Sequence, residues 1–294
     1  AMRIDGVGVR QMYPGEIGDV FDGEQIVVVG RYDAADAAKL PGGGGHARQA
    51  TVLLTGTYLG RKRVFEYPVE LAGPAADPTM DFVQTLWAVR RVGYLLDQIQ
   101  LHGETGEVVD ELIRLSKTYG IMTPYTSFLA DETTELADAD GVRSEARVRA
   151  DRLAKSATGG AAQNDAVNRA RLNEAVQVAG AAAPAGPAGE RGGVVQYGNT
   201  TTRQYAQGAV EVVRNVRQVG NDALYQRGKV WVAANAADVD PQADRRDVQV
   251  VQRFSEAYFR LARANTVQEN RLLATQRADE TLLIRLRGQA YLIE

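Results

Sequence analysis

The hydrophobic period of the chain changes at the breaker run GPAADP, residues 73–78. Before this run, apolar residues such as Phe65 and Tyr67 alternate with polar ones, which is the period of a strand with one buried face. After it, apolar residues such as Leu86 and Val89 recur every three or four positions, which is the period of a helix. The chain is therefore predicted to be α+β, with an N-terminal antiparallel β-sheet followed by helices.

Residues 1–75 are predicted to form a β-sandwich-like segment. The apolar run of residues 25–32 favours a strand covered on both faces, and residues 50–71 favour a hairpin with one buried face. The glycine run of residues 41–46 lacks the Lys-Ser/Thr ending of a phosphate-binding loop, so a flexible hairpin connection is the favoured interpretation. Because so few strands rarely close a sandwich alone, this sheet is expected to need a partner.

Two amphipathic helices are predicted in residues 79–132. The first carries one apolar stripe and leaves Arg90 and Arg91 largely off it. Thr105 can cap the second helix, and Gly120 can end it in the left-handed conformation. The two helices are expected to form an antiparallel hairpin packed on the N-terminal sheet.

Residues 133–205 are predicted to be an Ala/Gly-rich linker with weak order, because they contain few large apolar side chains. The run DADG at residues 138–141 begins like a calcium loop. However, Arg149 stands where such a loop needs a bidentate Glu, so a solvated charge cluster is favoured.

Residues 206–294 are predicted to form a small C-terminal α+β module. Glycine turns at Gly228 and Gly288 separate two pairs of short β runs. Ser255 is placed to cap a short helix between these pairs.

The composition excludes several kinds of site. Of 294 residues none is cysteine and 2 are histidine, so thiol catalysis is excluded, and neither a metal site nor a cofactor is expected. A net charge of -3 without a block of like charge is not the pattern of a nucleic-acid-binding protein. No run approaches the roughly 18 apolar residues of a membrane helix, so no membrane span is expected.

No catalytic constellation stands out, and the chain is predicted not to be an enzyme. The serines have no GxSxG setting, and no motif places a histidine beside them. One stretch, RLSKTYGIMTPYTSFLADE at residues 114–132, crowds four hydroxyls around a proline, at Thr123, Tyr125, Thr126 and Ser127. They could form a catalytic surface, or they could satisfy the backbone of an ordered turn, and the turn is favoured.

Residues 82–132, from FVQTLWAVRR to TPYTSFLADE, resemble the region that follows the von Willebrand type A domain in VIT-containing proteins, the group that includes the inter-alpha-trypsin inhibitor heavy chains. Residues 12–32 resemble the strands that follow the A domain, and residues 223–294 are similar in part to the C-terminal module of bacterial members. The positions that carry the signature are Trp87, Arg91, Gly93, Tyr94, Gly120, Thr123, Pro124, Tyr125, Thr126 and Ser127.

The resemblance implies a secreted or cell-envelope protein. In that family the adhesive metal site lies in the A domain, and this chain has no Asp-x-Ser-x-Ser run of the kind that forms it. The upstream A and VIT domains are then the expected partners within the same protein, and the N-terminal strands would complete a sandwich with the VIT segment. In heavy chains the aspartate of an Asp-Pro-His-Phe motif links to a glycosaminoglycan. Here Asp77-Pro78 is followed by Thr79 and Asp240-Pro241 by Gln242, so that activity is not implied.

Three functions remain open. The leading hypothesis is a non-catalytic structural or interaction segment that supports protein–protein contact or surface adhesion. The second is a self-assembling module, in which another copy or another chain completes the open sheet by strand exchange. The third, which has the weakest support, is a hydrolase that uses the hydroxyl cluster.

Overall fold

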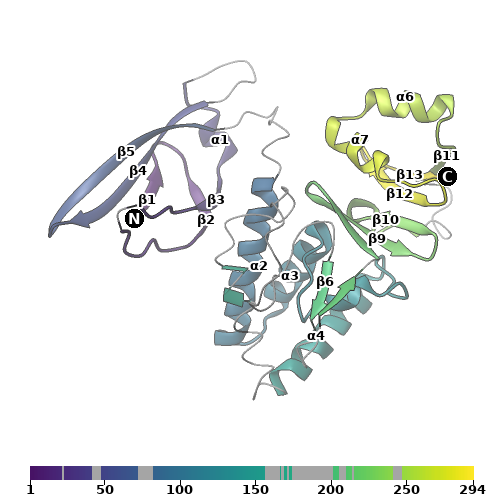
Figure 1. The fold of residues 1–294 in the computed structure, drawn as a ribbon, viewed down its shortest axis with the longest axis horizontal. Coiled ribbons are helices and arrows are strands. Elements are labelled where there is room, and N and C mark those ends of the chain that lie inside the picture. The colour runs from purple at the N-terminus through teal and green to yellow at the C-terminus, as the bar shows by residue number, and fades with distance from the viewer. Residues whose placement is uncertain are drawn as a thin grey trace, which may run out of the picture. The chain divides into compact units, whose positions relative to one another are not determined.

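The computed structural model describes residues 1–21, 23–41, 48–71, 82–155, 166, 169–170, 172–173, 201–204, 210–213, 215–240 and 247–294. These residues form an α+β chain, which confirms the predicted fold class (Figure 1). The chain divides into two compact units, Ala1–Arg91 and Val92–Glu294, called here the N-terminal and C-terminal units. Residues 42–46 of the glycine run and much of the predicted linker lie outside the described residues.

The N-terminal unit contains two antiparallel sheets and a short helix. The larger sheet has the order β1-β4-β5 and is formed by β1 (Met2–Ile4), β4 (Arg48–Tyr58) and β5 (Arg61–Leu71). The smaller sheet pairs β2 (Val9–Tyr13) with β3 (Val29–Tyr32), and α1 (Ala34–Ala37) follows it. A small core joins these elements and consists of Val7, Ala37, Ala50 and Leu71.

Strands β4 and β5 form the predicted hairpin. Their two-residue turn, Leu59-Gly60, has φ values of 49° and 71°, as a type I′ turn requires. The face that was predicted to be buried is nevertheless open near the turn, because Phe65 and Tyr67 are 38% and 50% exposed. The small core covers only the Leu71 end of the hairpin.

The strand predicted in residues 25–32 is shorter than expected. Strand β3 begins only at Val29, and Ile26 is 36% exposed. Val29 is buried but its neighbour Gly30 is exposed, so the run is not covered on both faces. The continuous apolar run therefore did not predict burial correctly. Among the described strands β3 pairs only with β2, so it is not a central strand of a larger sheet.

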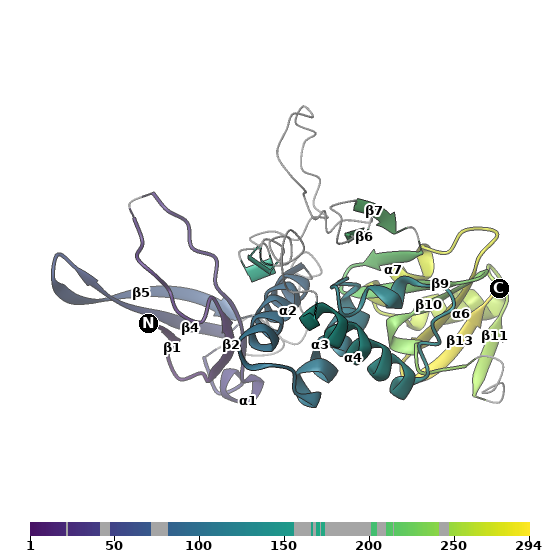
Figure 2. The ribbon, with the colours of Figure 1, turned by 90° about the horizontal axis from the view of Figure 1, so that it is seen from below.

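The C-terminal unit is built around a six-stranded mixed sheet with the order β11-β13-β12-β10-β9-β8 (Figures 1 and 2). The pairs β10–β12 and β11–β13 are parallel, and the other neighbours are antiparallel. The strands are β8 (Val216–Val219), β9 (Asp222–Arg227), β10 (Val230–Ala233), β11 (Val248–Val251), β12 (Thr281–Leu286) and β13 (Gln289–Ile293). A separate pair joins β6 (Thr201–Gln204) to β7 (Val210–Val213).

Two hydrophobic clusters involve this sheet. The first contains buried residues from α3 (Gly106–Tyr119), the 3-10 turn η2 (Ser127–Ala130), α4 (Ala139–Lys155), η3 (Ala234–Ala236) and the sheet. The second contains residues from α6 (Glu256–Ala264), α7 (Val267–Ala274) and the sheet. On β9, Tyr225 belongs to the first cluster and its neighbour Leu224 to the second, as expected for a sheet buried on both faces.

The packing of the helices differs from the predicted arrangement. Helix α2 (Phe82–His102) crosses the boundary between the two units, and α3 shares its core with the C-terminal sheet. Helix α4 lies in the segment that was predicted to be weakly ordered. Its Val142, Ala146 and Ala150 are buried, and small side chains of this kind let a helix pack closely despite burying little area each.

Candidate functional site

The segment that follows α3 begins at Gly120, as the sequence predicted. Gly120 has φ 66° and ψ 24°, and its N–H donates to the Ser116 carbonyl oxygen. A Cβ atom at this position would lie 3.2 Å from the Cβ of Ala223 on β9. Both the left-handed backbone and the close approach of the strand therefore favour glycine here.

The hydroxyls of Thr123 and Thr126 are used inside the turn. Their Oγ1 atoms are 2.8 Å apart, and the Thr123 N–H donates to the Thr126 Oγ1 at 3.1 Å. The Thr126 N–H closes the turn on the Thr123 carbonyl oxygen at 3.1 Å. Thr126 is fully buried and Thr123 is nearly so. These two buried hydroxyls hold the turn together.

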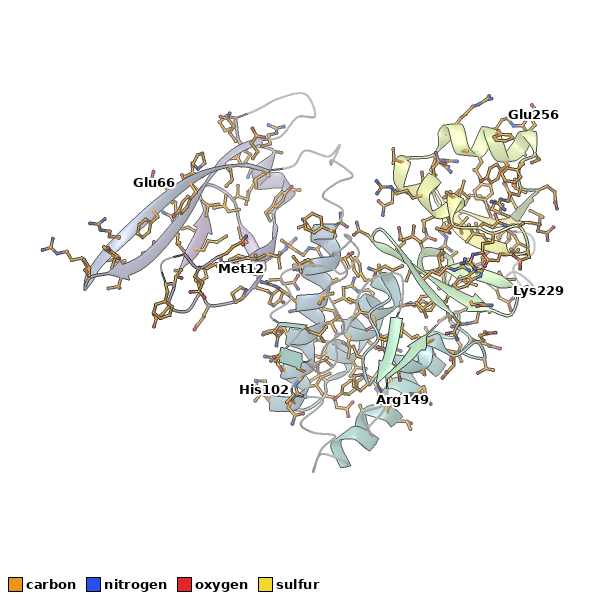
Figure 3. The ribbon with its side chains drawn as sticks, in the orientation of Figure 1. Met12, Glu66, His102, Arg149, Lys229 and Glu256 are labelled. Carbon is orange, nitrogen blue, oxygen red and sulfur yellow. The ribbon has the colours of Figure 1, made fainter. Side chains whose placement is uncertain are left out.

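Three other residues of the turn lie closer to the surface and are half-buried, namely Pro124, Tyr125 and Ser127. The Ser127 Oγ accepts a hydrogen bond from the Arg149 Nη1 at 2.9 Å. Arg149, which Figure 3 labels, also pairs with Glu145 at 2.8 Å and lies over the Phe128 ring, 5.2 Å from its centroid. The Arg149 side chain thus connects α4 to η2, a contact that stabilises the turn.

Strand β9 anchors both ends of this segment, which the sequence did not predict. The Tyr225 hydroxyl donates to the Lys117 carbonyl oxygen at 2.7 Å, and burial raises the pKa of this phenol. Arg227 donates to the carbonyl oxygens of Leu129 at 2.9 Å and Thr134 at 2.8 Å. Desolvation lowers the pKa of the Arg227 guanidinium. These contacts satisfy backbone carbonyls in the last turn of α3, in η2 and in the chain that follows η2.

Lys117 takes part in the same anchoring. Its Nζ donates to the Leu136 carbonyl oxygen at 2.9 Å, and desolvation by burial lowers its pKa. The lysine is thus bound to the backbone that follows residues 120–132, called here the signature segment, and this contact has a structural role.

Trp87 and Arg91 lie in the N-terminal unit, away from the turn in sequence. The Trp87 Nε1 donates to the Gln11 carbonyl oxygen at 3.1 Å, and the Arg31 guanidinium lies 5.0 Å from the Trp87 ring centroid. Arg91 donates to the Tyr13 hydroxyl at 2.8 Å. Both side chains thus connect α2 to β2 and its neighbours.

Arg90 was predicted to lie off the apolar stripe of α2, but it is buried. Its Nη1 donates to the carbonyl oxygens of Tyr13 at 2.8 Å and Val27 at 2.7 Å, and desolvation lowers its pKa. The guanidinium therefore satisfies backbone carbonyls on both sides of the loop between β2 and β3.

Gly93 and Tyr94 belong to the C-terminal unit. A Cβ atom at Gly93 would lie 2.9 Å from the Leu172 Cβ and 2.5 Å from the Asn173 Oδ1, so glycine permits a close helix contact there. Tyr94 is 40% exposed. The ten signature positions are thus distributed over two units and do not converge on one site.

A partly open surface is the apolar hairpin face, defined by Met2, Ile4, Val52, Leu54, Phe65 and Tyr67. Phe65 and Tyr67 are exposed, and the other four residues are half-buried. The strand register places Leu54 opposite Phe65 and Val52 opposite Tyr67, and directly opposed residues of a sheet share a face. Figures 1 and 2 show the turn end of this hairpin away from β2 and β3. The arrangement can bind an apolar partner.

The described ranges contain no group of three or more His, Asp or Glu side chains that could hold a metal ion. No helix within them is long and apolar enough to cross a membrane.

Comparison with known proteins identified no relative. No family model, no curated protein and no solved structure matches this chain.

Proposed function

We propose that the chain is a non-catalytic structural and interaction segment of a secreted or cell-envelope protein with VIT and von Willebrand type A domains. The observation that carries the proposal is the apolar hairpin face, on which Phe65 and Tyr67 remain 38% and 50% exposed. Two neighbouring exposed aromatic side chains on a half-buried apolar face are typical of a contact with another protein segment.

The proposed occupant of the apolar hairpin face is the VIT segment of the same protein. The resemblance of residues 12–32 and 82–132 supports this occupant, because the strands after the A domain complete a sandwich with the VIT segment in that family. The three-stranded sheet supports it separately, since so small a sheet needs a second layer to bury its apolar face.

The non-catalytic part of the proposal is supported by the turn at residues 123–127. Thr123 and Thr126 are buried and bonded to each other, and Ser127 accepts from Arg149. Purified chain is expected to show no turnover of ester, amide or phosphoester substrates. Reproducible turnover that a single substitution abolishes without loss of stability would refute this part.

The interaction part can be tested with the protein segment encoded upstream of residue 1. We expect that segment to contain an Asp-x-Ser-x-Ser A domain and VIT strands, and to bind the chain when the two are co-expressed. Phe65→Ser and Tyr67→Ser should weaken this binding. Val64→Ser is the matched control, because Val64 is 55% exposed and points to the opposite face of β5. A start codon in place of those domains, or equal binding by all three variants, would contradict the proposal.

A further inference from the structure

We propose that the open edge of β5 pairs with β5 of a second copy of this chain, in an antiparallel register that sets Val64 opposite Val64. Among the described residues, β5 pairs with β4 along one edge only. The pairing goes beyond the proposed function, because strand addition uses the backbone edge of β5 and engages only Phe65 of the apolar hairpin face.

The hairpin register determines which backbone groups face this open edge. Tyr58 and Arg61 flank the two-residue turn, and in such a hairpin the flanking residues form a hydrogen-bonded pair. Hydrogen-bonded pairs recur at every second residue of an antiparallel ladder. The N–H and C=O groups of Lys62, Val64 and Glu66 therefore point away from β4, toward the open edge.

Pro68 supports this assignment independently. It lies within β5 opposite Thr51, and a strand tolerates proline where the missing N–H would face an open edge. Pro68 also interrupts the row of edge donors beyond Glu66. The part of the edge that is available for pairing is thus residues 62–66, next to the turn.

The charges of residues 62–66 favour a second copy of this chain as the partner of the β5 edge. Lys62 and Glu66 are both exposed, and Figure 3 labels Glu66 on the hairpin. With Val64 on the two-fold axis, Lys62 of each copy lies opposite Glu66 of the other, so two opposite-charge pairs flank a valine pair. A parallel register would instead place Lys62 opposite Lys62.

The opposite face of the paired strands is also complementary. The same register places Arg63 of each copy opposite Phe65 of the other, which allows cation–π contacts. About six backbone hydrogen bonds would join the two strands. Because so short a ladder buries less area than the roughly 1,200 Å² of a stable interface, the dimer is expected to be weak and to dissociate on dilution.

Disulfide trapping tests the register directly. The chain has no cysteine, so Val64→Cys introduces a single thiol. In the proposed dimer the two Cα atoms at this position are about 5.5 Å apart, within the span of a disulfide. With oxidised glutathione, Val64→Cys should form linked dimers about tenfold faster than Glu70→Cys, an exposed control beyond Pro68 on the same strand.

A charge exchange then tests the identity of the partner. In the Val64→Cys background, Lys62→Glu should lower the rate of dimer linkage about tenfold, and adding Glu66→Lys should restore it. All four residues are exposed, so circular dichroism should give the same unfolding midpoint for every variant. Equal rates for Val64→Cys and Glu70→Cys would overturn the proposal. If adding Glu66→Lys did not restore the rate of dimer linkage, the proposal would also be overturned. The partner of the β5 edge would then be a strand of another protein.

Discussion

The Tyr225 hydroxyl lies 2.7 Å from the backbone carbonyl oxygen of Lys117, to which it donates a hydrogen bond. Tyr225 is fully buried in β9, and Lys117 lies in the last turn of α3. The bond therefore attaches the central sheet to the end of the helix that precedes the signature segment. Since burial raises the pKa of this phenol, the donor proton is retained across the neutral pH range.

Replacing Tyr225 with Phe should lower the free energy of unfolding by about 1–2 kcal/mol, because a buried carbonyl loses its donor. Urea denaturation of the purified chain measures this change. Tyr291→Phe is a suitable control, since Tyr291 is half-buried in the same sheet. Equal stability of the two variants would show that the Tyr225 hydroxyl does not anchor α3.

Gly120→Ala should lower the free energy of unfolding by about 1–2 kcal/mol, because alanine is strained at φ 66°. The Ala223 Cβ, 3.2 Å from the added methyl, should increase the loss. Gly103→Ala separates these two effects. Gly103 has φ 80°, but an added Cβ meets no atom within 4 Å. Equal losses in the two variants would contradict a role for the contact with Ala223.

Arg90→Met should destabilise the N-terminal unit by about 2–3 kcal/mol, since the carbonyls of Tyr13 and Val27 lose a charged donor. Hydrogen exchange of residues 13–29 should rise in this variant. Arg10→Met is the control, because Arg10 is exposed on β2. Unchanged exchange in Arg90→Met would mean that the buried guanidinium does not hold this loop.

Glu280 should make stability depend on pH in acid. Hydrogen bonds from Arg217 lower the pKa of Glu280 below its ordinary value of 4.5. Because the folded pKa is the lower one, the stabilisation is complete above pH 4.5 and is lost as the pH falls through the folded pKa. Glu280→Gln should thus be less stable than the unmodified chain at about pH 7, and the gap should narrow as the pH falls below 4.5. A gap that stays constant over this range would contradict the assignment.

Much of the local structure could be predicted from the sequence, because turns and helix ends are determined by nearby residues. Thr105 caps α3 through its side chain, and Gly120 ends the helix with a positive φ. The hairpin turns at Gly60 and Gly288 follow the same local rule. Helix α7 was missed, although Thr266 and its partner three residues later form a capping box that is visible in the sequence.

The contacts between distant segments could not be predicted in this way. Nothing near Arg90 in the sequence identifies the carbonyls of Tyr13 and Val27 as its partners, so the residue was expected off the buried stripe. The anchoring of α3 by Tyr225 joins residues more than a hundred positions apart. Periodicity identifies which face of an element is apolar, but it does not identify the element that covers this face.

The central claim is that the hydroxyls of the signature segment serve packing and not chemistry, and the free energy of unfolding of Thr126→Val tests it most directly. The variant keeps the shape of the side chain but removes its hydrogen bonds to the Thr123 N–H and hydroxyl. We expect a loss of about 2–3 kcal/mol, against less than about 0.5 kcal/mol for Ser127→Ala. A Thr126→Val protein with the stability of the unmodified chain would contradict the claim, most clearly if it had also lost a measurable hydrolytic turnover.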